Sequence, residues 1–103
     1  MFVQMKSITV AEGYVGKIVE QFASKGLIEG QPGFIDLSVL RKKKRGGNEE
    51  VIVMIRWESE EAWKSWETSE VHLAGHKENR KKLPPSYIIE KRQDVYHVLA
   101  TKM

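Results

Sequence analysis

The chain has 103 residues, of which 41% are hydrophobic and 30% are charged, and its formal net charge is +3. This composition is typical of a globular protein, and we expect residues 1–103 to form one domain with its own core. The absence of cysteine excludes a disulfide framework, a thiolate nucleophile and cysteine-ligated metal centres. Because no signal-peptide pattern or membrane-length apolar run is present, we expect a cytoplasmic protein without a membrane partner.

The densest positive charge runs from Arg41 to Arg45, just before the turn residues Gly46, Gly47 and Asn48. No aromatic side chains interleave with these charges, as a stacking platform for nucleic acid would require. The simpler interpretation is a solvated hairpin end whose lysines discourage edge-to-edge strand pairing. We therefore expect no nucleic-acid partner.

The first quarter of the chain predicts a strand followed by a helix. Residues 2–10 are rich in β-branched and apolar types, which favours a strand. Thr9 and Glu12 have the spacing of a helix capping box at the strand's exit. The helix itself is predicted by apolar residues at the i, i+3, i+4, i+7 spacing, which are Val15, Ile18, Val19 and Phe22. Gly26 is the expected stop.

The middle of the chain predicts a β-hairpin. After a turn at residues 31–33, residues 34–43 alternate well enough to form a second strand. The turn at residues 46–48 then folds the chain back into a third strand over residues 51–57. Pairing of these two strands is the natural arrangement.

Two helices and a strand are predicted for the remainder. Ser59 can cap a helix that begins near Glu60, and Ser69 offers a second cap, so residues 71–80 should form a separate short helix. Pro84 and Pro85 end helical structure. Residues 87–99 mix β-branched and charged types, which predicts a long, partly exposed last strand.

The resulting order predicts an α+β protein with the ferredoxin-like split βαβ arrangement and a second helix broken in two. Residues 51–55 are apolar at consecutive positions, which predicts that both faces of the sheet are buried there. Helices from one chain would cover only one face. A second copy should cover the other, which predicts a homodimer with a β-core between protomers.

The segment from Trp57 to Arg80 contains all three tryptophans and two of the three histidines, a combination that suggests a pocket. His72 and His76 have the i, i+4 spacing of the zinc motif His-Glu-x-x-His. Leu73 occupies the glutamate position, however, and no third ligand is evident, which argues against a metallohydrolase. No Gly-x-Ser-x-Gly elbow and no Walker or Rossmann glycine pattern occurs either.

A single histidine that faces an apolar, aromatic-lined pocket suits axial ligation of a haem iron. His76 fits this description, because the three residues before it are small or apolar and would let a flat macrocycle approach the helix. From spacing alone, a histidine satisfied at the helix surface is the simpler interpretation. Trp66 taken by itself is likewise interpreted as ordinary core.

Four segments carry a resemblance to a known family. Gln31-Pro-Gly-Phe34 precedes a strand, Trp57-Glu-Ser59 ends the next, and Trp66-Glu-x-Ser69-Glu-Val and Ala74-Gly-His76-Lys follow. Together they resemble the IsdG/HmoA type of haem-degrading monooxygenase in the antibiotic-biosynthesis-monooxygenase superfamily, closest to its HmoA branch. The resemblance covers nearly the whole chain. It implies a ferredoxin-like chain forming a dimeric α/β barrel, in which haem is both cofactor and substrate.

The resemblance also implies roles for individual residues. His76 becomes the ligand of the haem iron, and Trp66 becomes the bulky catalytic residue that presses the porphyrin out of plane. Phe22 lines the same pocket, and Lys25 stands where relatives carry a basic residue that can pair with a propionate. Alignment through residues 8–13 puts Lys6 where the family has an asparagine near the distal oxygen. There Lys6 would donate to bound dioxygen, pair with a propionate or point to water.

The implied activity is that of a haem oxygenase, which uses dioxygen and electrons from an unidentified reductase to open the porphyrin and release iron. Two alternatives remain open at this point. One is a cofactor-independent monooxygenase of the same superfamily that acts on a polycyclic phenol or quinone. The other is a dimer that stores or senses haem without turning it over.

Overall fold

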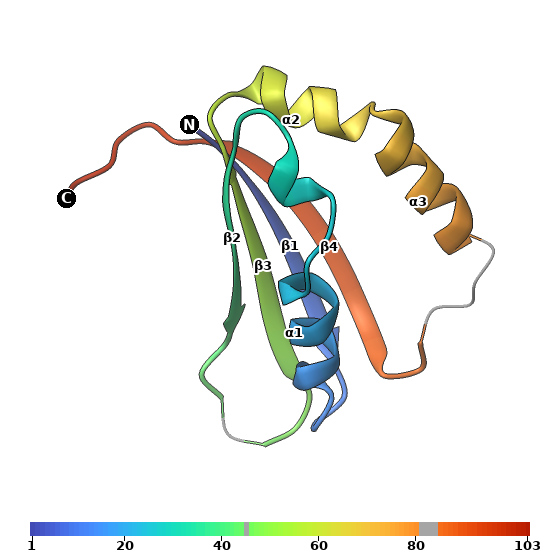
Figure 1. Ribbon diagram of the computed structural model, residues 1–103. Coiled ribbons are helices and arrows are strands. Elements are labelled where there is room, and N and C mark those ends of the chain that lie inside the picture. Colours follow the sequence, from blue (N-terminus) through green and yellow to red (C-terminus); the bar gives the residue numbers. More distant parts are fainter. Residues whose placement is uncertain (45, 81–84) are drawn as a thin grey trace.

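The computed structural model describes residues 1–44, 46–80 and 85–103, and for residues 76–80 it describes the backbone alone. Arg45 and Pro84, which belong to the predicted hairpin end and helix end, lie outside the described residues. The elements are β1 (Phe2–Val10), α1 (Val15–Ala23), the short 3-10 helix η1 (Ile28–Gly30), β2 (Phe34–Arg41), β3 (Glu49–Trp57), α2 (Glu60–Glu67), α3 (Glu70–Arg80) and β4 (Ile88–His97) (Figure 1). The predicted order is confirmed, and η1 is an addition to it.

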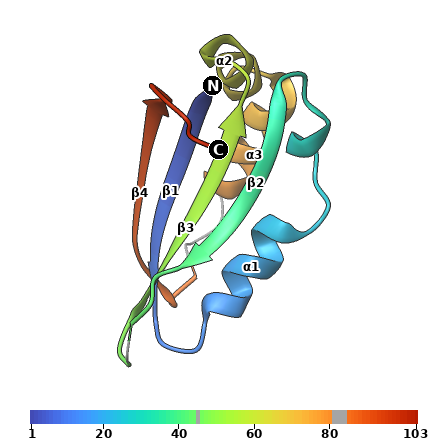
Figure 2. The ribbon, with the colours of Figure 1, turned by 90° about the vertical axis from the view of Figure 1, so that its left-hand side faces the viewer.

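The four strands form one antiparallel sheet in the order β2-β3-β1-β4. The helices α1, α2 and α3 all lie on one side of this sheet (Figure 2). This two-layer arrangement confirms the predicted ferredoxin-like α+β fold with a broken second helix. None of the described helices is long and apolar enough to cross a membrane.

The core lies between the sheet and the helices, and strand alternation selects its residues. On β3, the side chains at every second position point toward the helices and are at most 2% exposed: Val51, Val53, Ile55 and Trp57. From α1, Ile18 is fully buried and Phe22 packs on the cluster. Val19, predicted on the same helical face, is 41% exposed. The helix therefore meets the sheet along a narrower stripe than its sequence predicts.

The opposite face of the sheet is open in the single chain. Ile52 and Met54 on β3 are only half-buried, and Leu40 on β2 and Tyr96 on β4 are 45% and 48% exposed. Burial of both faces is therefore not achieved within one chain. The alternating burial of β3 arises because only one layer of helices is available to cover the sheet.

Two predicted helix caps are present. The Ser59 hydroxyl accepts a hydrogen bond from the Ala62 amide at 3.1 Å, and the Ser69 hydroxyl accepts one from the His72 amide at 3.2 Å. The Ser69 hydroxyl also donates to the Trp66 carbonyl at 2.7 Å. These bonds satisfy backbone groups at the end of α2 and the start of α3, so the chain breaks where the sequence indicates.

The capping box predicted at Thr9 and Glu12 is wrong. Thr9 is still in β1, where it pairs with Glu50, and α1 begins only at Val15. Its N-cap residue, Tyr14, makes no side-chain capping bond. The strand's ladder of hydrogen bonds extends to Val10, which prevents Thr9 from adopting the cap position.

Candidate functional site

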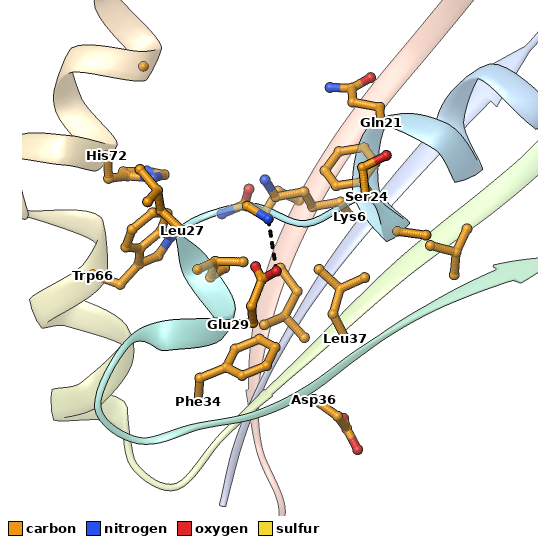
Figure 3. Close-up of a pocket in the computed structure, with 18 of the residues that line it drawn as sticks. Lys6, Gln21, Ser24, Leu27, Glu29, Phe34, Asp36, Leu37, Trp66 and His72 are labelled. Atoms are coloured by element: carbon orange, nitrogen blue, oxygen red, sulfur yellow. Dashed lines mark hydrogen bonds between the residues drawn. The ribbon is translucent and has the colours of Figure 1, made fainter.

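A cavity of about 1270 Å³ lies on the helix side of the sheet (Figure 3). Its walls come from α1 and η1 on one side and from α2 and α3 on the other. Ligand pockets usually measure about 300–1,000 Å³, so this cavity is large enough for a ligand of macrocycle size.

The floor of the cavity is formed by inward-facing strand residues. They come from all four strands and are mostly apolar: Lys6 and Ile8 on β1, Phe34, Leu37 and Val39 on β2, Ile55 on β3, and Lys91 and Gln93 on β4. Alternate residues of a strand face the same side, which is why these positions share one surface. The apolar floor suits a flat, hydrophobic ligand.

Three of the predicted site residues meet in this cavity. Lys6, Phe22 and Trp66 all line it, and the Lys6 Nζ atom lies 5.5 Å from the centroid of the Phe22 ring. Lys25 is not part of the wall, although its neighbours Ser24 and Gly26 are. The predicted propionate contact of Lys25 thus has no counterpart in the cavity wall of the single chain.

His76 lies on α3, directly after Gly75, which lines the cavity. The His76 side chain is outside the described part of the structure, so its predicted role as iron ligand stays a prediction. A Cβ atom added at Gly75 would meet no atom within 4 Å. There is therefore open space beside the turn of α3 that precedes His76, and a flat ring could approach the helix there.

Trp66 and His72 form an aromatic pair at one end of the cavity (Figure 3). Their ring centroids are 4.8 Å apart with the ring planes at 56°. The His72 side chain is 11% exposed, and its Nε2 atom lies 3.2 Å from the Glu67 Oε2 atom. In the sequence, His72 is distinguished only by its i, i+4 spacing from His76. The contact with Trp66 depends on the angle at the helix break, which sequence spacing does not reveal.

The remaining tryptophans are structural. Trp57 is fully buried at the end of β3, and Trp63 packs on Phe2 with ring centroids 5.2 Å apart.

Among the residues that the structure describes, no group of three or more acidic, histidine or cysteine side chains could hold a metal ion.

Lys6 is a cation of the cavity wall whose pKa is lowered by the fold. Burial lowers the pKa of Lys6 below its ordinary value of 10.5, and the positive charge of Lys91 on β4 lowers it further. The carboxylate of Glu67 acts in the opposite direction. A partly buried amine with a lowered pKa that lines a cavity is typical of functional sites.

Replacement of Lys6 by methionine should therefore stabilise the ligand-free protein. The folded state disfavours the charged amine, which lowers the free energy of unfolding. This loss of stability is fully present below the pKa that Lys6 has in the folded protein, and it disappears as pH rises past the unfolded value of 10.5. We expect Lys6→Met to melt at a higher temperature than wild type at pH 7, with a smaller gain near pH 10.5. Thermal unfolding followed by circular dichroism measures this.

The exposed α1 residue Lys17 provides the control for that experiment. Lys17→Met removes the same charge without removing a buried group, so its effect on melting temperature should be smaller. A Lys6→Met variant that is less stable than wild type at pH 7 would contradict the predicted cost of burying the amine.

The family model described as Antibiotic biosynthesis monooxygenase matches residues 1–78. A relative from Bacillus subtilis (strain 168), named heme-degrading monooxygenase HmoA, is 53% identical over 102 residues, which cover 99% of this chain and 94% of the relative.

Solved structures show the same fold. A crystal structure from Bacillus cereus, named for the same monooxygenase class, superposes with a TM-score of 0.88 at 54% identity and covers 99% of this chain and 96% of that one. A structure of the heme-degrader MhuD from Mycobacterium tuberculosis, with two hemes bound in its active site, has a TM-score of 0.74 at 24% identity and covers 100% of both chains.

Proposed function

Because the chain belongs to the antibiotic biosynthesis monooxygenase family, we propose that it is a haem-degrading monooxygenase that opens the porphyrin ring and releases iron. One observation carries this proposal most directly. Trp66, Phe22 and Lys6, far apart in the sequence, line a single cavity whose wall includes the turn of α3 before His76. The name of the Bacillus subtilis relative supports the same activity.

The cavity residues have separate tasks in this proposal. His76 on α3 would hold the haem iron, since the iron needs only one protein ligand. Trp66 would press on the macrocycle, because its indole is backed by the His72 ring at 4.8 Å and has little room to retreat. Phe22 and the apolar floor would exclude water from the ring.

Bound haem supplies the redox chemistry that activates dioxygen, with electrons from an external reductase. On this proposal, Lys6 faces the bound ring from β1 and presents an amine at the wall where the family carries an asparagine. Its lowered pKa makes proton release from the amine easier than from an exposed lysine. Lys25, outside the wall, would serve at most as a peripheral cation for a propionate.

A spectral time course tests the activity. Ferric haem should give a specific Soret shift on titration into the protein, and ascorbate with dioxygen should then bleach that band and release iron. A titration without a Soret shift would favour a cofactor-independent monooxygenase acting on a phenol or quinone. Tight binding with no bleaching would instead favour haem storage or sensing.

We also propose that two chains pair through the open face of the sheet. Ile52 and Met54 lie half-buried at the centre of this face, and Tyr96 lies 48% exposed on the edge strand β4. A second copy of the sheet would cover these side chains and complete an α/β barrel. We propose an external reductase and a cytoplasmic location together with this dimer.

Light scattering at micromolar concentration should give twice the chain mass of 11.9 kDa. Ile52→Lys would place a charge in the centre of the paired faces and should yield monomers. Leu73→Lys, on the outer side of α3, introduces the same charge at a residue that is 54% exposed and should leave the dimer intact. A wild-type chain that scatters as a monomer would contradict the pairing.

A further inference from the structure

Glu67, the last residue of α2, connects three elements through its two carboxylate oxygens. Its Oε1 atom accepts a hydrogen bond from the Gln4 Nε2 atom of β1 at 3.3 Å. Its Oε2 atom lies 3.2 Å from the His72 Nε2 atom of α3. Gln4 is only 1% exposed, so one end of this chain of contacts is anchored on a central strand.

The Glu67–His72 contact spans the break between α2 and α3. At this break the backbone is held by Ser69, whose hydroxyl bonds to the Trp66 carbonyl and to the His72 amide. Glu67 adds a side-chain link across the same gap. Its side chain is 27% exposed and that of His72 is 11% exposed, so water screens the contact less than it screens a surface ion pair.

The same link reaches Trp66 indirectly. The His72 ring packs on the Trp66 ring, and Glu67 limits rotation of the His72 ring by holding its Nε2 atom. Glu67 itself is not among the residues that line the cavity. Glu67 can therefore act on a ligand through the residues that it holds, or through its charge, which raises the pKa of Lys6.

We propose that Glu67 is a positioning residue, which sets the orientation of Trp66 relative to α3, the helix that carries His76. The inference rests on the proposed function, because this geometry matters when both residues face one haem. Trp66 and His76 lie on different helices, so their relative placement depends on the angle at the break. A displacement of about 1 Å at such a contact can cost about 100-fold in rate.

The first test uses the ligand-free protein labelled with fluorotryptophan. Its ¹⁹F spectrum contains signals from Trp57, Trp63 and Trp66, and the loss of one signal in Trp66→Phe assigns the relevant resonance. Glu67→Leu should shift or broaden the Trp66 signal and leave the Trp57 signal in place. An unchanged Trp66 signal in folded Glu67→Leu would overturn the proposal.

Two further variants separate positioning from charge. Glu67→Gln keeps the length and hydrogen-bonding capacity of the side chain, including a donor for the Gln4 Oε1 atom, which has no hydrogen-bond partner among the described residues. We expect its Trp66 signal to stay near that of wild type. If Glu67→Gln behaves like Glu67→Leu, loss of the charge near Lys6 is the cause and the positioning role is wrong.

Variants at neighbouring residues complete the test. His72→Leu removes the ring that packs on Trp66, so its change in the Trp66 signal gives the size of effect expected when this contact is lost. Glu67→Ala takes the place of Glu67→Leu if the latter fails to fold. Glu70→Leu removes an exposed carboxylate at the start of α3 and should leave all three signals unchanged. An effect of Glu70→Leu as large as that of Glu67→Leu would overturn the specific role of Glu67.

The second test uses the haem-loaded protein. Glu67→Leu should lower the rate of haem bleaching by about 10- to 100-fold, while the Kd for haem changes by less than about threefold because His76 is retained. Equal losses in both quantities would overturn the positioning role. If wild type binds no haem, the proposed function fails, whereas the ¹⁹F spectra still decide whether Glu67 orients Trp66.

Discussion

His76→Ala is expected to abolish the specific Soret shift of ferric haem and to slow haem bleaching at least about 100-fold, since on our proposal the variant would lack the protein ligand of the iron. Of the two histidines on α3, His76 is the one that the family resemblance assigns to the iron. His72 is held by Glu67 at 3.2 Å and packs on Trp66, which suits it to a supporting role.

Absorption titration and the ascorbate time course measure both effects. Added imidazole provides the control, because it can occupy the vacated position and should restore part of the Soret shift in His76→Ala. Circular dichroism of the ligand-free variant shows whether the fold is retained. The assignment of His76 is contradicted if His76→Ala binds ferric haem with an unchanged Soret band and still degrades it.

Gly33→Ala should have the largest effect on stability. Gly33 has φ of +84°, and an added Cβ atom would lie 2.4 Å from the Ala62 Cβ atom of α2. The left-handed conformation costs a residue with a side chain about 1–2 kcal/mol, and overpacking costs about 1–3 kcal/mol. We therefore expect the free energy of unfolding to fall by roughly 2–5 kcal/mol, a large part of a typical domain's stability.

Urea denaturation measures this change. The matched control is Gly16→Ala at the start of α1, where an added Cβ atom meets nothing within 4 Å. This variant should be at least as stable as wild type, because alanine has the higher helix propensity. A backbone hydrogen bond ties Gly33 to the start of α2, because the Glu58 amide donates to the Gly33 carbonyl at 2.8 Å. A Gly33→Ala variant as stable as wild type would show that α2 can move away without cost.

Local sequence patterns predict most of the secondary structure. Ser59 and Ser69 occupy the caps that their types indicate, and β1 spans the predicted residues. These features depend on groups within about four residues of one another, so neighbouring side chains are sufficient to specify them. The capping box predicted at Thr9 shows where local patterns fail. Thr9 pairs with Glu50 of the neighbouring strand, and this pairing keeps it in β1 rather than at a helix cap.

The candidate site was predicted in part. Trp66 and Phe22 were identified through the family resemblance, and the fold brings both to one cavity with Lys6. The same resemblance included Lys25, which the structure leaves outside the cavity wall. Lys25 lies two residues beyond the end of α1, in a connection to η1 whose path no helical spacing specifies.

The sequence by itself therefore determined the order of strands and helices and the break near Ser69, and its family resemblance made Trp66 and His76 a candidate pair. Only the tertiary structure decided which groups support that pair. The bond between Gln4 and Glu67 joins residues 63 positions apart, and Gly33 faces Ala62 across the junction of β2 and α2. Such contacts depend on how the helices pack on the sheet, which no local pattern specifies.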